Sequence, residues 1–276
     1  MAGFAQNLPI MSGTLVSAQW VQQHFSEVII CDVVAGPNAR SIYIEEHVEG
    51  ALWVDLETQL SAPYEDASAL GRHPLPTPQT FAHTLGTLGI SPDSTVVLYD
   101  RTCGIMAAAR MWWMLRAMGH QKVAVVDGGL QALKNIGLPI ATGDVVPVPT
   151  TYPTTLMQYQ WPLVDMKDIA PAIAAGKCLV DVRAAARYEG VEEPIDPVAG
   201  HIPGAINMPL MEVISGDQFL SPEALQSHFR PLQHKEVIVH CGSGVTACHT
   251  ILALVHAGYP VPALYNGSWS QWCRNH

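Results

Sequence analysis

The stretch Val237-Ile238-Val239-His240-Cys241-Gly242-Ser243-Gly244-Val245-Thr246 predicts the local fold around a cysteine. Its apolar, β-branched beginning predicts a strand, its two glycines predict a tight turn, and residues 246–257 predict a helix. The N–H groups of such a turn point inward and, with the positive end of the helix, form a cradle for negative charge. This cradle stabilises a thiolate, the reactive form of cysteine. We therefore expect Cys241 to be a nucleophile, although a buried apolar thiol is the alternative at a strand end.

The other cysteines show no sign of a shared framework. The chain has six cysteines, no CxxC pair, and few cysteines for its length, so we expect free thiols rather than disulfides. Three of them lie in apolar strand or helix contexts and are expected to be buried and unreactive: Cys31, Cys178 and Cys248. Cys103 and Cys273 lie in less defined contexts, and the same reading is favoured for both.

Length and charge limit the class of protein. The 276 residues, 49% of them hydrophobic, are enough for one large or two small domains with a sizeable core. A net charge of −10 without a basic run disfavours a nucleic-acid partner. Residues 1–20 lack the pattern of a signal peptide, and the most apolar helical segment, 105–118, contains two arginines and is too short to span a bilayer. We expect a cytoplasmic protein with no membrane partner.

No motif for a bound metal accompanies the cysteines. The sequence has no HExxH and no paired CxxC, and scattered histidines are usually surface or structural residues. We therefore expect neither a metal site nor a cofactor.

The chain contains two copies of one unit. Four landmarks recur in the same order in both halves. They are Asp32-Val33 and Asp181-Val182, residues 47–51 and 201–205, residues 96–99 and 237–240, and Gly128 and Gly267. Residues 141–162, with prolines at 147, 149, 153 and 162, separate the copies and predict an extended linker. We expect a non-catalytic domain at 1–140, a linker at 141–162 and a catalytic domain at 163–276.

Each copy alternates short apolar runs with helical patterns, which predicts an α/β fold with a mainly parallel sheet flanked by helices. In the second copy we expect strands at 179–182, 205–208, 236–240 and 263–265, and helices at 222–229, 245–257 and 268–273. Ligands of such sheets bind beyond the carboxyl ends of the strands, where Cys241 lies. The first copy has Asp100 at the corresponding place, and a carboxylate cannot perform thiol chemistry. The second copy is therefore expected to be the catalytic one.

Two other uses of a cysteine loop are disfavoured. A cysteine phosphatase closes its loop with an arginine that binds phosphate, but Thr246, Ala247 and Cys248 are not cationic. A papain-like protease needs a base histidine and its orienting partner, and no protease signature surrounds Cys241.

The loop from Cys241 to Thr246, with residues 265–272 and the His201-Ile202-Pro203-Gly204-Ala205 motif, resembles the two-domain rhodaneses, most of all the mercaptopyruvate sulfurtransferases. The resemblance covers nearly the whole chain and implies two tandem rhodanese-like domains. It implies transfer of sulfane sulfur from 3-mercaptopyruvate, through a Cys241 persulfide, to cyanide or to a thiol such as thioredoxin or a small dithiol. Thiosulfate-preferring relatives typically have basic residues where this chain has Gly242 and Ser243. A thiosulfate sulfurtransferase, and a persulfide carrier or interaction protein without enzymatic activity, are the alternatives.

The resemblance also assigns site residues. Ser243, His73 of His73-Pro74-Leu75-Pro76, and Glu57 correspond to a hydroxyl, base and orienting acid that move the substrate proton. The remaining loop residues are expected to bind the substrate or the persulfide; they are Gly242, Gly244, Val245 and Thr246.

Arg187 corresponds to the family's arginine for the substrate carboxylate, and here the chain departs from the pattern. Ile195 stands where a second arginine is usual, and Asn266 replaces an aspartate. Arg72 and Arg101 are the candidates to replace the missing cation, but their sequence context is typical of solvated loop arginines. We therefore expect weak binding of a keto-acid donor.

Overall fold

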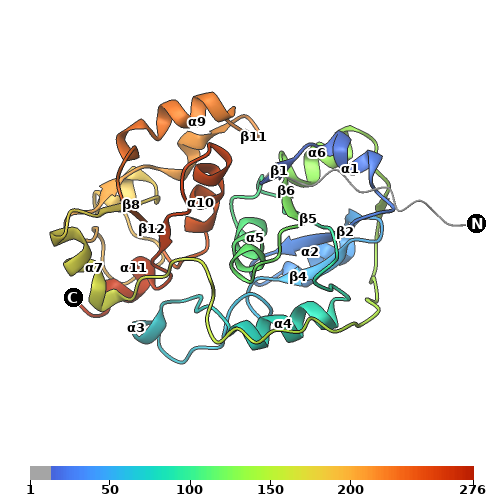
Figure 1. The fold of residues 1–276 in the computed structure, drawn as a ribbon, viewed down its shortest axis with the longest axis horizontal. Coiled ribbons are helices and arrows are strands. Elements are labelled where there is room, and N and C mark those ends of the chain that lie inside the picture. The colour runs from blue at the N-terminus through green and yellow to red at the C-terminus, as the bar shows by residue number, and fades with distance from the viewer. Residues whose placement is uncertain (1–13) are drawn as a thin grey trace, which may run out of the picture.

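The computed structural model describes residues 14–276, in two lobes that lie side by side (Figure 1). The expectation about a signal peptide rests partly on residues 1–13, which lie outside the described residues. No helix among the described residues combines the length and apolarity needed to cross a membrane.

The first lobe contains a parallel sheet of five strands in the order β1-β6-β5-β2-β4. The strands are β1 (Leu15–Val16), β2 (Ile29–Val34), β4 (Leu52–Asp55), β5 (Val96–Tyr99) and β6 (Val123–Val126). The helices are α1 (Ala18–Gln23), α2 (Ala39–Glu45), α3 (Ala67–Leu70), α4 (Pro78–Thr87), α5 (Ala107–Ala117) and α6 (Gly129–Asn135). Helices α1 and α6 share one apolar cluster with the sheet, and α4 and α5 share the other, so both faces are covered.

The second lobe repeats this plan with a parallel sheet of four strands in the order β13-β12-β8-β9. The strands are β8 (Cys178–Asp181), β9 (Ile206–Asn207), β12 (Val237–His240) and β13 (Ala263–Leu264). The helices are α7 (Met166–Ala174), α8 (Ala185–Tyr188), α9 (Pro222–His228), α10 (Ala247–His256) and α11 (Ser268–Trp272). The predicted α/β class is confirmed, and every strand and helix expected in the second copy is present within two residues of its predicted bounds.

Short elements connect these layers. The 3-10 helices η1 (Leu210–Val213) and η2 (Arg230–Leu232) and the hairpin of β10 (Ile214–Ser215) with β11 (Gln218–Phe219) lie in the second lobe. Strand β3 (His47–Val48) pairs antiparallel with β7 (Ile140–Ala141) in the first. The first residue of the expected linker, Ala141, therefore belongs to a strand, because its backbone pairs with His47. Residues 142–162 contain no helix or strand, and the domain boundaries themselves stay a prediction.

The two lobes meet through α5 and α10, which face each other in the middle of the molecule (Figure 1). One buried apolar cluster runs from α4 and α5 of the first lobe into β12 and α10 of the second. Trp161 at the end of the linker packs its ring edge-on against Trp112 of α5, with ring centroids 5.3 Å apart. Continuous burial of this kind holds the two lobes in one arrangement.

A segment of the first lobe crosses to the second. Helix α3 packs on α11, as Figure 1 shows at the lower left. The Gln271 side chain donates to the Ala69 carbonyl at 2.6 Å, and the Arg72 N–H donates to Ser270 Oγ at 3.1 Å. These bonds place Arg72 and His73, which belong to the first half of the sequence, against the second lobe.

Candidate active site

Cys241 lies at the carboxyl end of β12, in the tight loop that connects this strand to α10. The residue is only 1% exposed, and its Sγ accepts a hydrogen bond from the Gly244 N–H at 3.2 Å. The Cys241 N–H donates to Ser268 Oγ at 3.2 Å. The carbonyl oxygens of Cys241 and Gly242 accept from the first turn of α11 at 3.0 and 2.8 Å. The loop is therefore fixed on both sides, and α10 begins directly after it at Ala247.

Gly244 is required at its position in this loop. Its φ of +80° lies in the left-handed region, which side chains of other residues disfavour. A Cβ there would also overlap the Asn266 carbonyl oxygen. Val245 and Thr246, the next two predicted loop residues, differ in exposure. Val245 is 3% exposed, whereas Thr246 is half-buried just before α10.

The corresponding loop of the first lobe contains a carboxylate in the same kind of cradle. Asp100 follows β5, and its Oδ1 accepts from the N–H groups of Thr102 and Gly104, both at 2.8 Å. Its Oδ2 accepts from the Ala108 N–H at 3.3 Å. The equivalent loops of the two repeats thus aim backbone N–H groups at the residue that follows the strand. Three such groups donate to Asp100, and the Gly244 N–H donates to the Cys241 sulfur.

The structure brings Ser243, His73 and Glu57 together across the lobe interface. His73 Nδ1 lies 2.8 Å from Ser243 Oγ, and His73 Nε2 lies 3.3 Å from Glu57 Oε1. Burial lowers the pKa of His73 below its ordinary value, an effect that Glu57 opposes and that Arg110 and Arg72 reinforce. The imidazole is therefore neutral near pH 7 and can accept a proton.

Arg187 reaches the same loop from α8. Glu193 binds it twice, with Nε at 3.2 Å from Oε2 and Nη2 at 2.6 Å from Oε1. Both Nη atoms of Arg187 lie 3.6 Å from the place that a Cβ of Gly242 would occupy. Ile195, at the position of the absent arginine, is 54% exposed and contributes only its N–H to Glu193, at 3.1 Å.

Arg72 differs from the expectation of a solvated loop arginine. Its side chain is only 19% exposed, and Asp196 binds it twice, at 3.1 and 3.3 Å. Its Nη2 lies 3.3 Å from the Cβ position of Gly242. Arg101, the other candidate, pairs instead with Asp32 of the first lobe at 2.6 Å, so the structure does not bring it to the loop.

Sequence reasoning missed the buried Arg110 of α5, which joins the two lobes. Its Nη1 donates to the carbonyl oxygen of Gly244 at 3.2 Å and to Asn266 Oδ1 at 2.5 Å, and its Nη2 donates to the His73 carbonyl at 3.1 Å. Burial lowers the pKa of this guanidinium. Asn266 also donates to the His73 carbonyl, at 3.1 Å, so both residues tie the His73 segment to the cysteine loop. The available signal was an arginine near the middle of a largely apolar helix, whose other arginine, Arg116, lies in its last turn.

The roles of Asp196 and Ser268 were missed as well, because Asp196 belongs to no motif and Ser268 was quoted within residues 265–272 without a role. Each acts through a contact that depends on the tertiary fold, Asp196 with Arg72 and Ser268 with the Cys241 N–H.

The remaining thiols lack the setting of Cys241. All six cysteines are free. Burial raises the pKa of the other five, to about 11 for Cys103 and to about 12 for Cys248. Among residues 14–276, no three His, Cys, Asp or Glu side chains are grouped to hold a metal ion.

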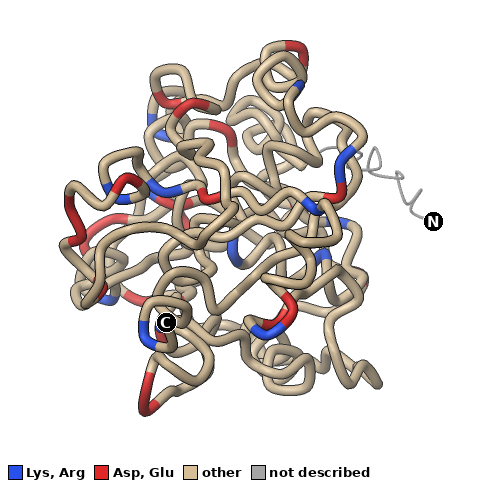
Figure 2. The backbone as a smooth tube through the Cα atoms, turned by 90° about the vertical axis from the view of Figure 1, so that its left-hand side faces the viewer, with Lys and Arg blue, Asp and Glu red and all other residues tan. Residues whose placement is uncertain are grey.

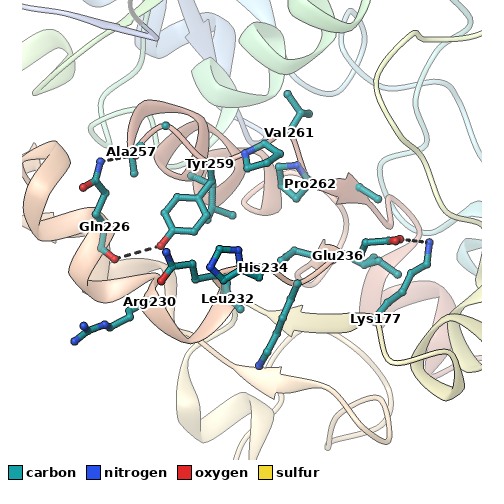
Figure 3. Close-up of a pocket in the computed structure, with 18 of the residues that line it drawn as sticks. Lys177, Gln226, Arg230, Leu232, His234, Glu236, Ala257, Tyr259, Val261 and Pro262 are labelled. Carbon is teal, nitrogen blue, oxygen red and sulfur yellow. Dashed lines mark hydrogen bonds and ion pairs between the residues drawn. The ribbon is translucent and has the colours of Figure 1, made fainter.

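The second lobe has a surface pocket away from the cysteine. A surface pocket of about 940 Å³ lies at the amino ends of the parallel strands, between Lys177 and Glu236 on one side and Tyr259 on the other (Figure 3). Cys241 follows the opposite, carboxyl end of β12, so this pocket is separate from the thiol site.

The charged residues do not separate by sign along the chain. Acidic and basic positions are interspersed along the described backbone (Figure 2).

Comparison with known proteins agrees with this architecture. The rhodanese-like domain family matches residues 17–136 and 165–275, and the chain belongs to this family. A protein of Pseudomonas aeruginosa named "Probable 3-mercaptopyruvate sulfurtransferase" is 40% identical over 277 residues, covering 95% of each chain. The thiosulfate sulfurtransferase of Bos taurus is 37% identical over 245 residues, covering 85% of this chain and 80% of its own.

Solved structures give the same result. The 3-mercaptopyruvate sulfurtransferase from Leishmania major superposes with a TM-score of 0.84 at 30% identity, over 98% of this chain and 76% of that one. The chain is thus a two-domain sulfurtransferase of the rhodanese family.

Proposed function

We propose that this enzyme transfers sulfane sulfur from 3-mercaptopyruvate to a thiol acceptor through a persulfide on Cys241. The observation that carries the proposal is the Cys241 sulfur, which accepts from the Gly244 N–H, in the same loop as the hydrogen-bonded chain of Ser243, His73 and Glu57. Relatives named for this donor, at 33–40% identity over nearly the full length, support it.

In the donor step, the Cys241 thiolate attacks the sulfur of 3-mercaptopyruvate. A sulfur–sulfur bond forms, and the carbon–sulfur bond of the donor breaks with its electron pair on carbon. The resulting pyruvate enolate takes up the proton that the donor thiol gives up. The products are pyruvate and the Cys241 persulfide anion.

Ser243, His73 and Glu57 move that proton in our proposal. The neutral imidazole of His73 accepts the proton of the donor thiol through the Ser243 hydroxyl and returns it to the enolate carbon. Glu57 orients the ring from its other nitrogen, at 3.3 Å, and stabilises the transient imidazolium.

The loop and Arg187 bind the two ends of the donor. The N–H groups of Gly242, Gly244, Val245 and Thr246 stabilise negative charge on sulfur, and the guanidinium of Arg187 binds the carboxylate. In the second half-reaction an acceptor thiolate attacks the outer sulfur of the persulfide. The sulfur–sulfur bond then breaks, and its electron pair returns to Cys241.

A donor panel tests the proposal. The protein is incubated with 3-mercaptopyruvate, thiosulfate or cysteine persulfide, and mass spectrometry measures the gain of one sulfur atom on Cys241. We expect 3-mercaptopyruvate to exceed thiosulfate in kcat/KM by about 10-fold or more, because only a donor whose carbon takes up a proton makes use of Ser243, His73 and Glu57. Equal or faster turnover of thiosulfate would contradict the proposed donor.

Thiosulfate sulfurtransferase is the second candidate, because Arg72 and Arg187 both lie beside Gly242 and the Bos taurus relative is 37% identical. The donor panel separates the two candidates. A persulfide that forms on Cys241 without catalytic turnover would instead indicate a sulfur carrier.

We propose thioredoxin or a small dithiol as the acceptor, in the cytoplasm. Six free cysteines suit a reducing compartment, where such thiols are abundant. Loading Cys241 with sulfur and then following its loss with each acceptor tests the first point, and cell fractionation tests the second.

A further inference from the structure

Two guanidinium groups from different lobes meet over the residue that follows the nucleophile. Arg72 Nη2 lies 3.3 Å, and both Nη atoms of Arg187 lie 3.6 Å, from the Cβ position of Gly242. Any side chain at this position would contact both arginines. The backbone beside Cys241 therefore lies against two cations, one from each half of the sequence.

Buried carboxylates fix the orientation of both groups. Asp196, whose side chain is fully buried, binds Arg72 at Nε and Nη2, and Glu193 binds Arg187 at the same two atoms. Arg187 Nη2 also lies 3.7 Å from Asp196, so a shared acid links the two arginines. Guanidinium groups held in this way lose little further entropy when they bind an anion.

The network that holds the arginines has an excess of positive charge. Among the described residues, its ion pairs join four arginines to three carboxylates. These residues are Arg72, Arg183, Arg187 and Arg274, and Asp181, Glu193 and Asp196. These ion pairs thus leave one guanidinium charge unmatched at contact distance, although Asp66 also acts on Arg274 from further away.

Each of the two arginines also has a donor to spare. The hydrogen bonds of Arg72 and Arg187 to described residues use Nε and Nη2, and the Nη1 groups have no such partner. A guanidinium offers five N–H donors in a plane, so one edge of each remains able to bind carboxylate oxygens.

We propose that Arg72 and Arg187 together bind the carboxylate of a keto-acid donor, so that the first lobe supplies half of the anion site. This inference rests on the proposed function. It explains why Ile195 can be apolar and half exposed, since the second cation comes from the His73 segment instead. It replaces the expectation of weak donor binding with a complete two-arginine site.

Substitution of Arg72 tests the inference through binding. For Arg72→Ala we expect KM for 3-mercaptopyruvate and the inhibition constant of pyruvate, which has the same carboxylate but no sulfur, to rise about 10-fold or more. The kcat should change little, which is the pattern of lost uniform binding. Arg72→Lys, which keeps the charge but not the planar fork, should be intermediate. Ile195→Arg in the wild-type background should leave both constants nearly unchanged.

The control is Arg40→Ala, which removes an exposed arginine of the same lobe that pairs with Asp144. It should leave KM and the pyruvate constant at the wild-type values. Thermal unfolding establishes that each variant is folded, and if Arg72→Ala does not fold, Arg72→Lys and Arg72→Gln decide the question.

Failure of the inference is distinct from failure of the proposed function. If the wild-type protein forms no persulfide from 3-mercaptopyruvate, the donor assignment is wrong. If it does form persulfide, but folded Arg72 variants keep wild-type KM and pyruvate inhibition, the donor assignment stands and the role of Arg72 is overturned. A strong fall of KM in Ile195→Arg would also overturn it, because it would show an incomplete anion site.

Discussion

His73 Nδ1 of the first lobe lies 2.8 Å from Ser243 Oγ of the second, a hydrogen bond between residues 170 positions apart in the sequence. The contact depends on α3 docking on α11 and on Arg110, which binds the carbonyl oxygens of His73 and Gly244. A thiol loop on one lobe thereby faces a histidine on the other. Four predictions follow from this arrangement and from the burial of other residues.

Cys241 should be the only cysteine that accumulates sulfane sulfur. We expect Cys241→Ser to abolish transfer, because the cradle N–H groups then face a hydroxyl that is a far weaker nucleophile. The matched variant is Cys248→Ser, whose thiol pKa burial raises to about 12 and which should keep most of the activity. Mass spectrometry of peptides after donor treatment measures the site, and persulfide found mainly on another cysteine would refute the assignment.

His73→Ala should slow the donor half-reaction without unfolding the protein. Removal of a general acid–base group typically lowers the rate by about 10²–10⁴-fold. Rapid-mixing measurement of pyruvate release gives the rate, and thermal unfolding gives the stability. The stability should change little because the bonds from Arg110 and Asn266 to the His73 backbone carbonyl remain in the variant. His83→Ala, at an exposed helix position, is the control. A His73→Ala rate equal to that of the wild type would mean that no relay operates.

The donor half-reaction should lose rate only at acid pH. Burial lowers the pKa of His73 below its ordinary value of 6.5, so the neutral base persists below that pH and is lost as pH falls through the lowered pKa. We expect the acid limb of the rate to have its midpoint below 6.5. Glu57→Gln should move the limb to still lower pH, because Glu57 opposes the downward shift. A limb at or above 6.5, or an upward shift in Glu57→Gln, would contradict this account.

The stability of the fold should fall as the solution becomes acidic, partly because of His249. Its ring is fully buried against Phe219, neither nitrogen has a hydrogen-bond partner among the described residues, and burial lowers its pKa to about 3. Since the unfolded chain takes up a proton near pH 6.5 and the folded chain does not, stability present above that pH declines progressively below it. At about pH 5 this group alone should cost roughly 2 kcal/mol of unfolding free energy.

Urea unfolding at neutral and acid pH measures this dependence. His249→Leu should flatten it, whereas His83→Ala should keep it. An unchanged pH dependence in His249→Leu would show that the ring does not stay neutral in the folded protein.

Much of the local structure followed from short-range pattern. The β-branched run before Cys241, the glycines after it and the apolar helix beyond predicted β12, the loop and α10 with small errors at the ends. The helix begins at Ala247 rather than earlier, because Gly244 and its left-handed φ still belong to the cradle. The repeat of landmarks likewise predicted two similar parallel sheets.

The anion site was predicted less well. A sequence pattern gives the identity of an arginine but not the acceptor that its guanidinium meets, so Arg72 was predicted to be a solvated loop residue. In the fold, Asp196 binds it at 3.1 Å, although the two residues are 124 positions apart. Arg110 was recognised only as a charge in an apolar helix, because its acceptors are carbonyl groups from three other segments.

The sequence by itself determined the strand, the cysteine turn and the helix, because those choices depend on residues within a few positions of one another. It also determined the repeat, and hence the class of fold. Only the tertiary structure decided which side chains face the Cys241 sulfur. The packing of α5 on α10 and of α3 on α11 brings His73, Glu57 and Arg72 to a loop whose Ser243 lies 170 positions beyond His73. Contacts at such separation depend on the burial of whole surfaces, and no local spacing of residues records them.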